Sequence, residues 1–397
     1  MLFQILDDKK DCLGIFTQDK FYYGSLRESF SKTWDWSPHL TNTDYNYARL
    51  YCGGQTLDQV CPEELKDRYK IYKGKIRAFI KAVSIAKINV SDICLFDLIP
   101  EQHLRHWCQV KNEICEYVFE NYKRPANHKF LSDLSEMVHD IKNRPVKINQ
   151  NRLYYYAQSD YKAKTLWKKF GGQESFIFYN IWGTITGRLS TMENTFPILN
   201  LKKDIADIVE PTNDAFVQLD FNGAEIRSLL SLSGKDQPDG DIHLWNMENI
   251  YRNIGSRAKA KQRFFAWLYN PNSQDHLTNR FYNREKILKK YYMNNIVSTP
   301  FGRQIESDDF HALNYLLQSA SSDNCLLQAI TIYKLLKGRK SFLHSIVHDS
   351  ITIDLHREDR SMIPQIKEIF EDTRLGKFPS SVQIGKNYRD LEVVSWS

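Results

Sequence analysis

The strongest constraint on what this chain can fold into is a series of residues four apart: Arg257, Lys261, Phe265 and Tyr269. On an α-helix, each step of four residues turns about 400°, so successive members drift only about 40° around the axis. The series therefore predicts a helix over residues 255–269 with two cations and two aromatic rings along one side, about 18 Å from end to end. Such a face could hold a triphosphate at one end and a flat ring at the other. Taken alone, the series is more typical of a surface helix whose aromatic residues face the core, because short patterns often arise by chance.

Composition indicates a globular protein, and its mildly basic charge suits a polyanionic partner but is also typical of many soluble proteins. The chain has 397 residues, of which 42% are hydrophobic and 26% charged, and its net charge is +6. This length allows two or three structural units, and this composition argues against disorder. No apolar run reaches membrane-spanning length, and the first eight residues turn acidic too early for a secretory signal. The seven cysteines are odd in number and lack Cys-x-x-Cys spacing, so we expect neither a disulfide framework nor a zinc site but a reducing, cytoplasmic location.

Apolar periodicity organises the first half of the chain. Residues 1–60 are rich in aromatic and turn residues and predict strands and loops, whereas apolar residues at helical spacing predict helices over 63–88, 100–122 and 130–141. The segment 154–169 is basic and rich in tyrosine. A solvated helix face and a DNA contact explain that segment equally well.

Two isolated aspartates follow apolar runs in the second half. Asp220 ends the expected strand 215–219, ahead of an expected helix at 223–230, and Asp349 lies in the turn of an expected hairpin formed by 343–347 and 351–355. Turn aspartates are often purely conformational. However, two carboxylates at strand ends of one sheet can hold two divalent cations, and such a pair promotes in-line displacement at phosphorus. Oxygen ligands suit Mg²⁺, and phosphoryl transfer also needs cations that position the phosphates.

The order of the motifs is more specific than any one of them. They occur at residues 186–190, 197–200, 220–227, 241–243, 257–269, 299–303, 314 and 318, 347–349, and 384–388. From about residue 180 to the C-terminus, this order resembles the family A DNA polymerases, the group of bacterial polymerase I and many phage replicative enzymes.

The resemblance implies an α/β (α+β) right-hand fold with an antiparallel palm sheet, helical fingers, a short thumb and a small N-terminal α/β region. The expected divisions are an N-terminal region at 1–125, a thumb or linker at 126–178, the palm at 179–240 and 311–397, and the fingers at 241–310. Residues 1–150 contain no Asp-x-Glu, so we expect no proofreading exonuclease. Residues 1–125 are then either a reduced, inactive exonuclease-like domain, which we slightly favour, or they contribute the helix pair of the thumb.

The resemblance also assigns catalytic and nucleotide-binding roles. Asp220 and Asp349 would ligate two Mg²⁺ ions, with Mn²⁺ as a substitute, and the backbone carbonyl of Phe221 would add a ligand. The incoming dNTP would contact the 257–269 series, with Arg257 and Lys261 on the triphosphate, Phe265 beside the sugar, and Tyr269 stacking in the template-base position when the fingers are open. His243 would join the cations, and Glu225 would close over the sugar 2′ position and exclude a hydroxyl.

Four further residues resemble contacts to primer-template DNA near the nascent base pair: Arg188, Asn314, Gln318 and His348. Minor-groove acceptors are alike on every correct pair, so groups that contact them could check geometry without reading sequence. For Asn314 and Gln318 the ordinary alternative is a satisfied polar pair on one helix.

Three departures from the family pattern stand out. Asp220 is followed by Phe221-Asn222-Gly223 instead of Tyr-Ser-Gln, Asn270-Pro271 replaces the usual glycine and predicts that the helix ends there, and Ser350 replaces an acidic residue. The resemblance therefore implies a DNA-directed DNA polymerase, a nucleotidyltransferase of phage-like replication or repair in a bacterial host cytoplasm. Its partners would be primer-template DNA, dNTPs and other replication proteins, with no membrane. A single-subunit RNA polymerase and a decayed, DNA-binding replication scaffold are the alternatives.

Overall fold

The computed structural model describes residues 3–7, 14–23, 32–35, 37, 46–88 and 94–394. The chain divides into two compact units, Met1–Asp140 and Ile141–Ser397. The division lies inside the segment 126–178 that the sequence marks as a thumb or linker.

The first unit combines a small antiparallel sheet with an antiparallel helix pair. Tyr69 of α2 stacks on Trp107 of α4 with ring centroids 5.4 Å apart, and Arg68 pairs with Glu113 at 2.9 Å. The predicted helices are confirmed to within a few residues. The described elements are β1 (Gln4–Asp7), β2 (Gly14–Thr17), β3 (Lys20–Tyr23), β4 (Lys32–Thr33), β5 (Asn46–Tyr47), α1 (Leu57–Val60), α2 (Glu63–Ile85), α3 (Leu95–Leu98), α4 (Glu101–Asn121) and α5 (His128–Lys142).

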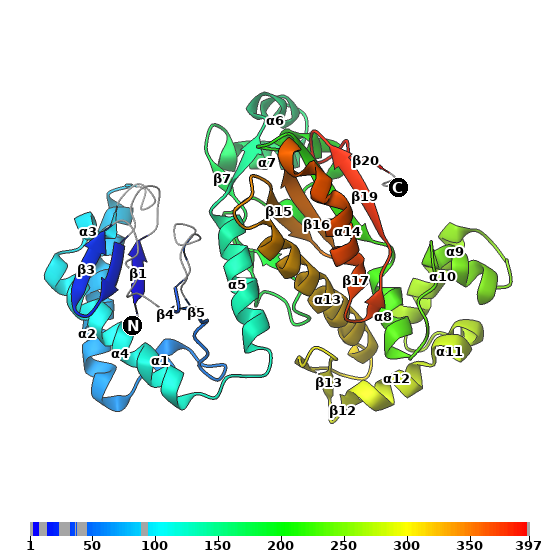
Figure 1. Ribbon diagram of the computed structural model, residues 1–397, viewed down its shortest axis with the longest axis horizontal. Helices are drawn as coiled ribbons and strands as arrows, with labels where there is room; N and C mark the ends of the chain where they lie inside the picture. The colour runs from blue at the N-terminus through cyan, green and yellow to red at the C-terminus, as the bar shows by residue number, and fades with distance from the viewer. Residues whose placement is uncertain are drawn as a thin grey trace. The chain divides into compact units, whose positions relative to one another are not determined.

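A five-stranded antiparallel sheet organises the second unit, with strand order β15-β16-β11-β19-β20. The long helix α13 and the helix α14 run across this sheet (Figure 1). The strands are β11 (Ala215–Phe221), β15 (Phe342–Val347), β16 (Ser350–Leu355), β19 (Ser380–Gly385) and β20 (Glu392–Val393), and the two helices are α13 (Ala312–Leu336) and α14 (Ile363–Glu371). The predicted mixed α and β class with an antiparallel sheet is confirmed.

Five helices form a second region of this unit, here called the helical layer: α8 (Ala224–Leu232), α9 (Ile242–Asn249), α10 (Arg257–Tyr269), α11 (His276–Tyr282) and α12 (Arg284–Tyr291). The layer shares one hydrophobic core with the start of α13, built around fully buried side chains such as Leu229, Phe264 and Trp267. Its entry from β11 depends on Gly223, whose φ is +71° and where a Cβ would lie 2.7 Å from Ile242. A side chain at this position would be both strained and obstructed, which explains the glycine between Asp220 and the helix.

Shorter elements complete the unit: β6 (Pro145–Ile148), α6 (Gln150–Ala157), α7 (Tyr161–Phe170), β7 (Ser175–Phe176), β8 (Tyr179–Asn180), β9 (Ser190–Thr191), η3 (Ile198–Asn200), η4 (Lys203–Ile208), β10 (Val209–Glu210), β12 (Tyr292–Met293), β13 (Ile296–Ser298), β14 (Gln304–Glu306), η5 (Arg357–Met362), β17 (Asp372–Thr373) and β18 (Gly376–Lys377). The basic segment 154–169 thus forms two helices, with Tyr155 and Tyr161 exposed.

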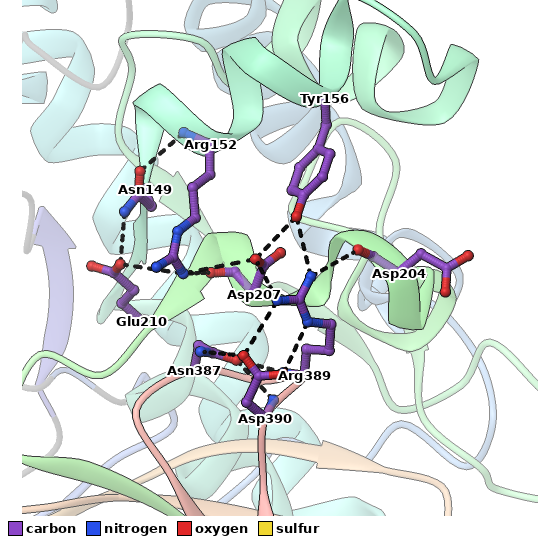
Figure 2. Close-up of polar contacts among 9 residues, drawn as sticks. All are labelled: Asn149, Arg152, Tyr156, Asp204, Asp207, Glu210, Asn387, Arg389 and Asp390. Atoms are coloured by element: carbon purple, nitrogen blue, oxygen red, sulfur yellow. Dashed lines mark hydrogen bonds and ion pairs between the residues drawn. The ribbon is translucent and has the colours of Figure 1, made fainter.

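A polar network holds the loop after β19 against η4 and α6 (Figure 2). Arg389 pairs with the buried Asp207 at 3.0 Å and with Asp390 at 3.0 Å, and it also donates to the hydroxyl of Tyr156 at 3.1 Å. Tyr156 in turn donates to Asp207 at 3.0 Å, and Arg152 donates to the Asp207 carbonyl at 3.0 Å. Because a buried carboxylate is stable only when it is paired, this network fixes the C-terminal motif at the edge of the sheet.

Two expectations require correction. The sequence predicts a hairpin turn of three residues, His348-Asp349-Ser350, but the turn contains only His348 and Asp349, because Ser350 already pairs with Val347 as the first residue of β16. Five cysteines are free thiols, as expected, but Cys94 is disulfide-bonded. In the part of the chain that is described, no helix combines the length and apolar character needed to cross a membrane.

Candidate active site

A cavity of about 470 Å³ lies where the helical layer meets the central sheet. It gathers every predicted site residue except Asn314 and Gln318. The residues that line it are Arg188, Asp220, Phe221, Asn222, Gly223, Ala224, Glu225, His243, Arg257, Lys261, Phe265, Tyr269, His348, Asp349 and Ser381.

Strand register brings the two aspartates together. Asp220 in β11 is paired with Ser350 in β16, and Asp349 directly precedes Ser350 in the hairpin turn. The backbone N–H of Phe221 donates to the Asp349 carbonyl at 3.4 Å, so the turn lies against the end of β11. Burial, together with the neighbouring charge of Asp349, raises the pKa of Asp220 to about 7. Burial likewise raises the pKa of Asp349.

The electrostatics and the donor atoms of this pair fit a hard divalent cation. Two half-buried carboxylates that line the same cavity repel each other when both are ionised, and a bound cation would relieve that repulsion. Their ligand atoms are oxygens, which Mg²⁺ prefers. Within the described residues, no group of three or more His, Cys, Asp or Glu side chains is placed to hold a metal ion. Asp220 and Asp349 would therefore be the two carboxylate ligands of such a site.

Helix α10 directs the 257–269 series into the cavity. Its opposite side packs into the core through Ala260, Phe264, Trp267 and Leu268. The aromatic residues that face the core are therefore Phe264 and Trp267, whereas Phe265 and Tyr269 line the cavity with their rings stacked 5.7 Å apart. The ordinary alternative holds in part, because the half-buried Phe265 also packs against this core, whereas Tyr269 is exposed at the cavity wall.

The ends of α10 follow the local sequence. The Ser256 side chain accepts from the backbone N–H of Lys259 at 3.4 Å and caps the first turn. The helix ends at Tyr269 with Asn270 as its C-cap, which confirms the end predicted from Asn270-Pro271.

The two cations of the series have different surroundings. The Arg257 guanidinium pairs with Asp241 at 2.6 Å, while the other oxygen of Asp241 accepts from the backbone N–H groups of His243 and Leu244 and caps α9. Lys261 makes no ion pair or hydrogen bond to any described residue. Its charge instead lowers the pKa of Asp220, against the larger effect of burial. Lys261 is therefore the cation most available to a ligand.

Glu225, in the first turn of α8, joins two other cavity residues. Its Oε1 accepts from Arg188 Nη2 at 2.5 Å, and its Oε2 accepts from the Tyr269 hydroxyl at 2.9 Å. The last residue of α10 is thus connected through one carboxylate to the loop 181–189.

His243 lies beneath the cavity and is only 3% exposed. Burial lowers its pKa to about 4, so the imidazole is neutral near pH 7. Its Nδ1 is buried without a hydrogen-bond partner, and its ring centroid lies 6.0 Å from that of Phe265. A neutral imidazole with an unused nitrogen can still accept or donate a hydrogen bond to a ligand that enters the cavity.

The four predicted DNA contacts divide into two pairs. Arg188 and His348 line the cavity, and His348 has a φ of +56° in the hairpin turn. Asn314 and Gln318 do not line it, and Gln318 Nε2 donates to Asn314 Oδ1 at 2.7 Å along α13. Asn314 and Gln318 therefore form a hydrogen-bonded polar pair on one helix, which is the alternative to a DNA contact that the sequence also allows.

Two further arginines support the cavity, the buried Arg227 and the half-buried Arg303, and the sequence patterns do not single them out. Arg227 is fully buried and donates to the carbonyls of Asn222, Pro238 and Gly240 at 2.7, 2.9 and 2.6 Å, which fixes the loop between α8 and α9. Arg303 pairs with the buried Asp323 at 2.7 Å and holds the loop next to Arg188 against α13. In the sequence, the only signal for these roles is that both arginines lie within the ordered motifs.

The fold defined by this sheet, helical layer and cavity is that of a polymerase domain. A solved structure described as "POL domain of Pol1 from M. smegmatis complex with DNA primer-template and dNTP" is similar, with a TM-score of 0.57 over 73% of this chain and 76% of that chain, at 13% sequence identity. At this identity the similarity establishes the fold. No family model and no curated protein matches the sequence.

Proposed function

We propose that the protein is a template-directed DNA polymerase that adds dNTPs to a primer 3′-hydroxyl and releases pyrophosphate. The observation that carries the proposal is that one cavity holds the Asp220–Asp349 pair and all four residues of the 257–269 series. The polymerase-type fold supports it, because the similar POL domain was solved with primer-template DNA and dNTP.

Asp220 and Asp349 would hold two Mg²⁺ ions, with the Phe221 carbonyl as a further oxygen donor. Bound there, the ions would activate the attacking hydroxyl and neutralise charge on the leaving pyrophosphate. The raised pKa of Asp220 supports this role, because the residue gains most from a nearby positive charge.

The residues of the helical layer would bind and orient the nucleotide. Arg257 and Lys261 would neutralise the triphosphate, and His243 would supply a hydrogen bond from a neutral ring. Phe265 would lie against the sugar, with Glu225 beside it to exclude a 2′-hydroxyl. Most of the catalysis of phosphoryl transfer is positioning and charge neutralisation, which these groups are placed to supply.

In this proposal the central sheet is the palm, the helical layer belongs to the fingers, and Arg188 and His348 contact DNA beside the nascent pair. Asn314 and Gln318 would contact DNA only if they exchanged their mutual hydrogen bond for one to a base. For the first unit, the antiparallel helix pair α2 and α4 supports a thumb-like role as much as a reduced exonuclease-like domain.

Primer extension with Mg²⁺ and dNTPs tests the proposal directly. The unaltered protein should extend the primer, and D349N should abolish extension while retaining DNA affinity. A folded protein that forms no product would refute the proposal and favour a DNA-binding scaffold. Parallel reactions with NTPs separate a DNA polymerase from an RNA polymerase, which would prefer ribonucleotides.

A further inference from the structure

A second hollow of about 560 Å³ lies in the helical layer, formed by the segment after α8 together with α11 and α12. Its described lining includes five cationic side chains and no Asp or Glu: Lys235, Arg280, Lys286, Lys289 and Lys290. Nothing in the proposed chemistry uses these residues.

The cations of this hollow are uncompensated. Elsewhere in the same layer, Arg263 pairs with Asp275 and Arg257 pairs with Asp241, both at 2.6 Å. None of the five has an ion-pair partner among the described residues. On α12, Lys289 and Lys290 follow Lys286 by three and four residues, so both lie on the same side of the helix as Lys286. A concentration of positive charge without internal partners attracts a polyanion.

Aromatic surface accompanies the charge. Phe281 lines the hollow, and the ammonium group of Lys235 lies 4.0 Å from its ring centroid. Positively charged grooves that contain aromatic side chains are typical of sites for single-stranded nucleic acid, because every base has a face that can stack.

The hollow is connected to the candidate active site by rigid elements. Glu225 at the start of α8 lines the active-site cavity and Leu232 at its end lines the second hollow, about 10 Å apart along the helix. Arg284, the first residue of α12, donates to the Asn270 carbonyl at 3.2 Å and lies 4.7 Å from the Trp267 ring, so it fixes α12 to the end of α10. At the rise of a stacked DNA strand, about 3.4 Å per nucleotide, this axial distance along α8 corresponds to about three nucleotides.

We propose that this hollow binds the phosphate backbone of single-stranded DNA a few nucleotides from the active site. The inference rests on the proposed function, since it makes the hollow a second DNA contact of the same enzyme. The strand could be the template ahead of the templating base or the strand displaced in front of the enzyme, and the same chemistry would hold either.

The test compares K286E/K289E/K290E with K203E/R374E/K377E in the full chain. The control removes the same positive charge from η4 and from the β17–β18 segment of the same unit, where the three residues are exposed and have no ion pair among the described residues. Fluorescence anisotropy measures affinity without nucleotide for primer-templates with template overhangs of one to twelve nucleotides, and for nicked duplexes with a displaced flap. Circular dichroism checks folding, and K286Q/K289Q/K290Q is a milder version that should weaken binding in the same direction.

We expect the α12 variant to lose about tenfold or more in affinity, only for overhangs beyond about three nucleotides or only for flaps, with the salt slope reduced by about two to three. A loss of affinity only for long template overhangs identifies the template as the strand bound in the hollow. A loss only for flap substrates identifies the displaced strand. Equal losses in variant and control, loss on all substrates alike, or no loss would overturn the inference. If the unaltered protein shows this binding but does not extend primers, the inference stands and the polymerase proposal fails.

Discussion

The hydroxyl of Tyr269 donates to Glu225 Oε2 at 2.9 Å, while Arg188 holds the other oxygen of the same carboxylate. This contact joins the last residue of α10 to the first turn of α8. Burial and the adjacent Glu225 charge both raise the pKa of Tyr269, so the phenol remains a hydrogen-bond donor throughout the useful pH range. Glu225 is therefore held in place at the wall of the cavity before any ligand enters.

If Glu225 excludes a 2′-hydroxyl, E225A should increase ribonucleotide incorporation. Removing a steric clash in a shaped pocket changes discrimination by about 10- to 100-fold. The measurement is the ratio of kcat/KM for dNTP and NTP in single-nucleotide primer extension. Y269F is the matched control, because it loses about 1 kcal/mol of hydrogen bonding but keeps the carboxylate and the stacked ring. Unaltered sugar selectivity in E225A would remove Glu225 from this role.

Asp220 should make the stability of the metal-free protein pH-dependent. Its pKa is about 7 in the folded state and near 3.8 in the unfolded chain. Below about pH 4 the Asp220 carboxyl group is protonated in both the folded and the unfolded state, so it does not lower the free energy of unfolding. As the pH rises from 4 to 7 the unfolded chain loses this proton first, so the stability associated with Asp220 is lost progressively, and above 7 the loss is complete.

Thermal unfolding in EDTA at a series of pH values measures this effect. D220N should be more stable than the unaltered protein at pH 8, and the two should converge near pH 4. Adding Mg²⁺ at pH 8 should raise the unfolding midpoint of the unaltered protein by more than that of D220N, because a ligand stabilises the state that binds it. Equal Mg²⁺ responses would contradict the metal role, and a midpoint difference independent of pH would contradict the pKa assignment.

The ion pair between Arg257 and Asp241 should compete with a triphosphate for the guanidinium. Asparagine caps helices about as well as aspartate, so D241N removes the charge while keeping the cap of α9. Exposed pairs contribute up to about 1 kcal/mol, so we expect D241N to lower the dNTP dissociation constant by about two- to fivefold. R257A should raise it about tenfold or more, through loss of a charged hydrogen bond.

Equilibrium binding of dNTP to the enzyme–DNA complex of each variant provides the measurement. Weaker binding in D241N would mean that Asp241 instead holds Arg257 in its binding position. Circular dichroism on D241N checks that α9 remains folded.

Local periodicity accounts for what the sequence could predict. The series on α10 follows from 3.6 residues per turn, and Asp220 and Asp349 follow from strand ends, so local pattern is enough to predict these residues without any tertiary contact. Arg227 could not be identified, because its partners are backbone carbonyls brought near it by the fold. Asn314 and Gln318 lie on a side of α13 that is set by tertiary packing. Their separation from the cavity could therefore not be predicted from the sequence.

Gly187 offers a test of how tightly the loop beside Arg188 must be packed. Its φ is +79°, and a Cβ there would lie 2.4 Å from Cζ of Arg303, which is itself paired with the buried Asp323. Gly302 has a similar φ of +84° but nothing within 4 Å of a Cβ. Both alanine variants therefore carry the backbone strain of a left-handed conformation, roughly 1 kcal/mol, and only G187A also displaces the guanidinium.

We expect G187A to lower the free energy of unfolding by at least about 2 kcal/mol more than G302A, because displacing Arg303 leaves the buried Asp323 without its ion-pair partner. Urea unfolding of both variants measures the difference directly. G187A should also weaken primer-template binding, since Arg188 follows it in the loop, whereas G302A should leave binding unchanged. Equal stabilities would show that the guanidinium can move aside at no cost, and the loop would then not be held by the Arg303–Asp323 pair.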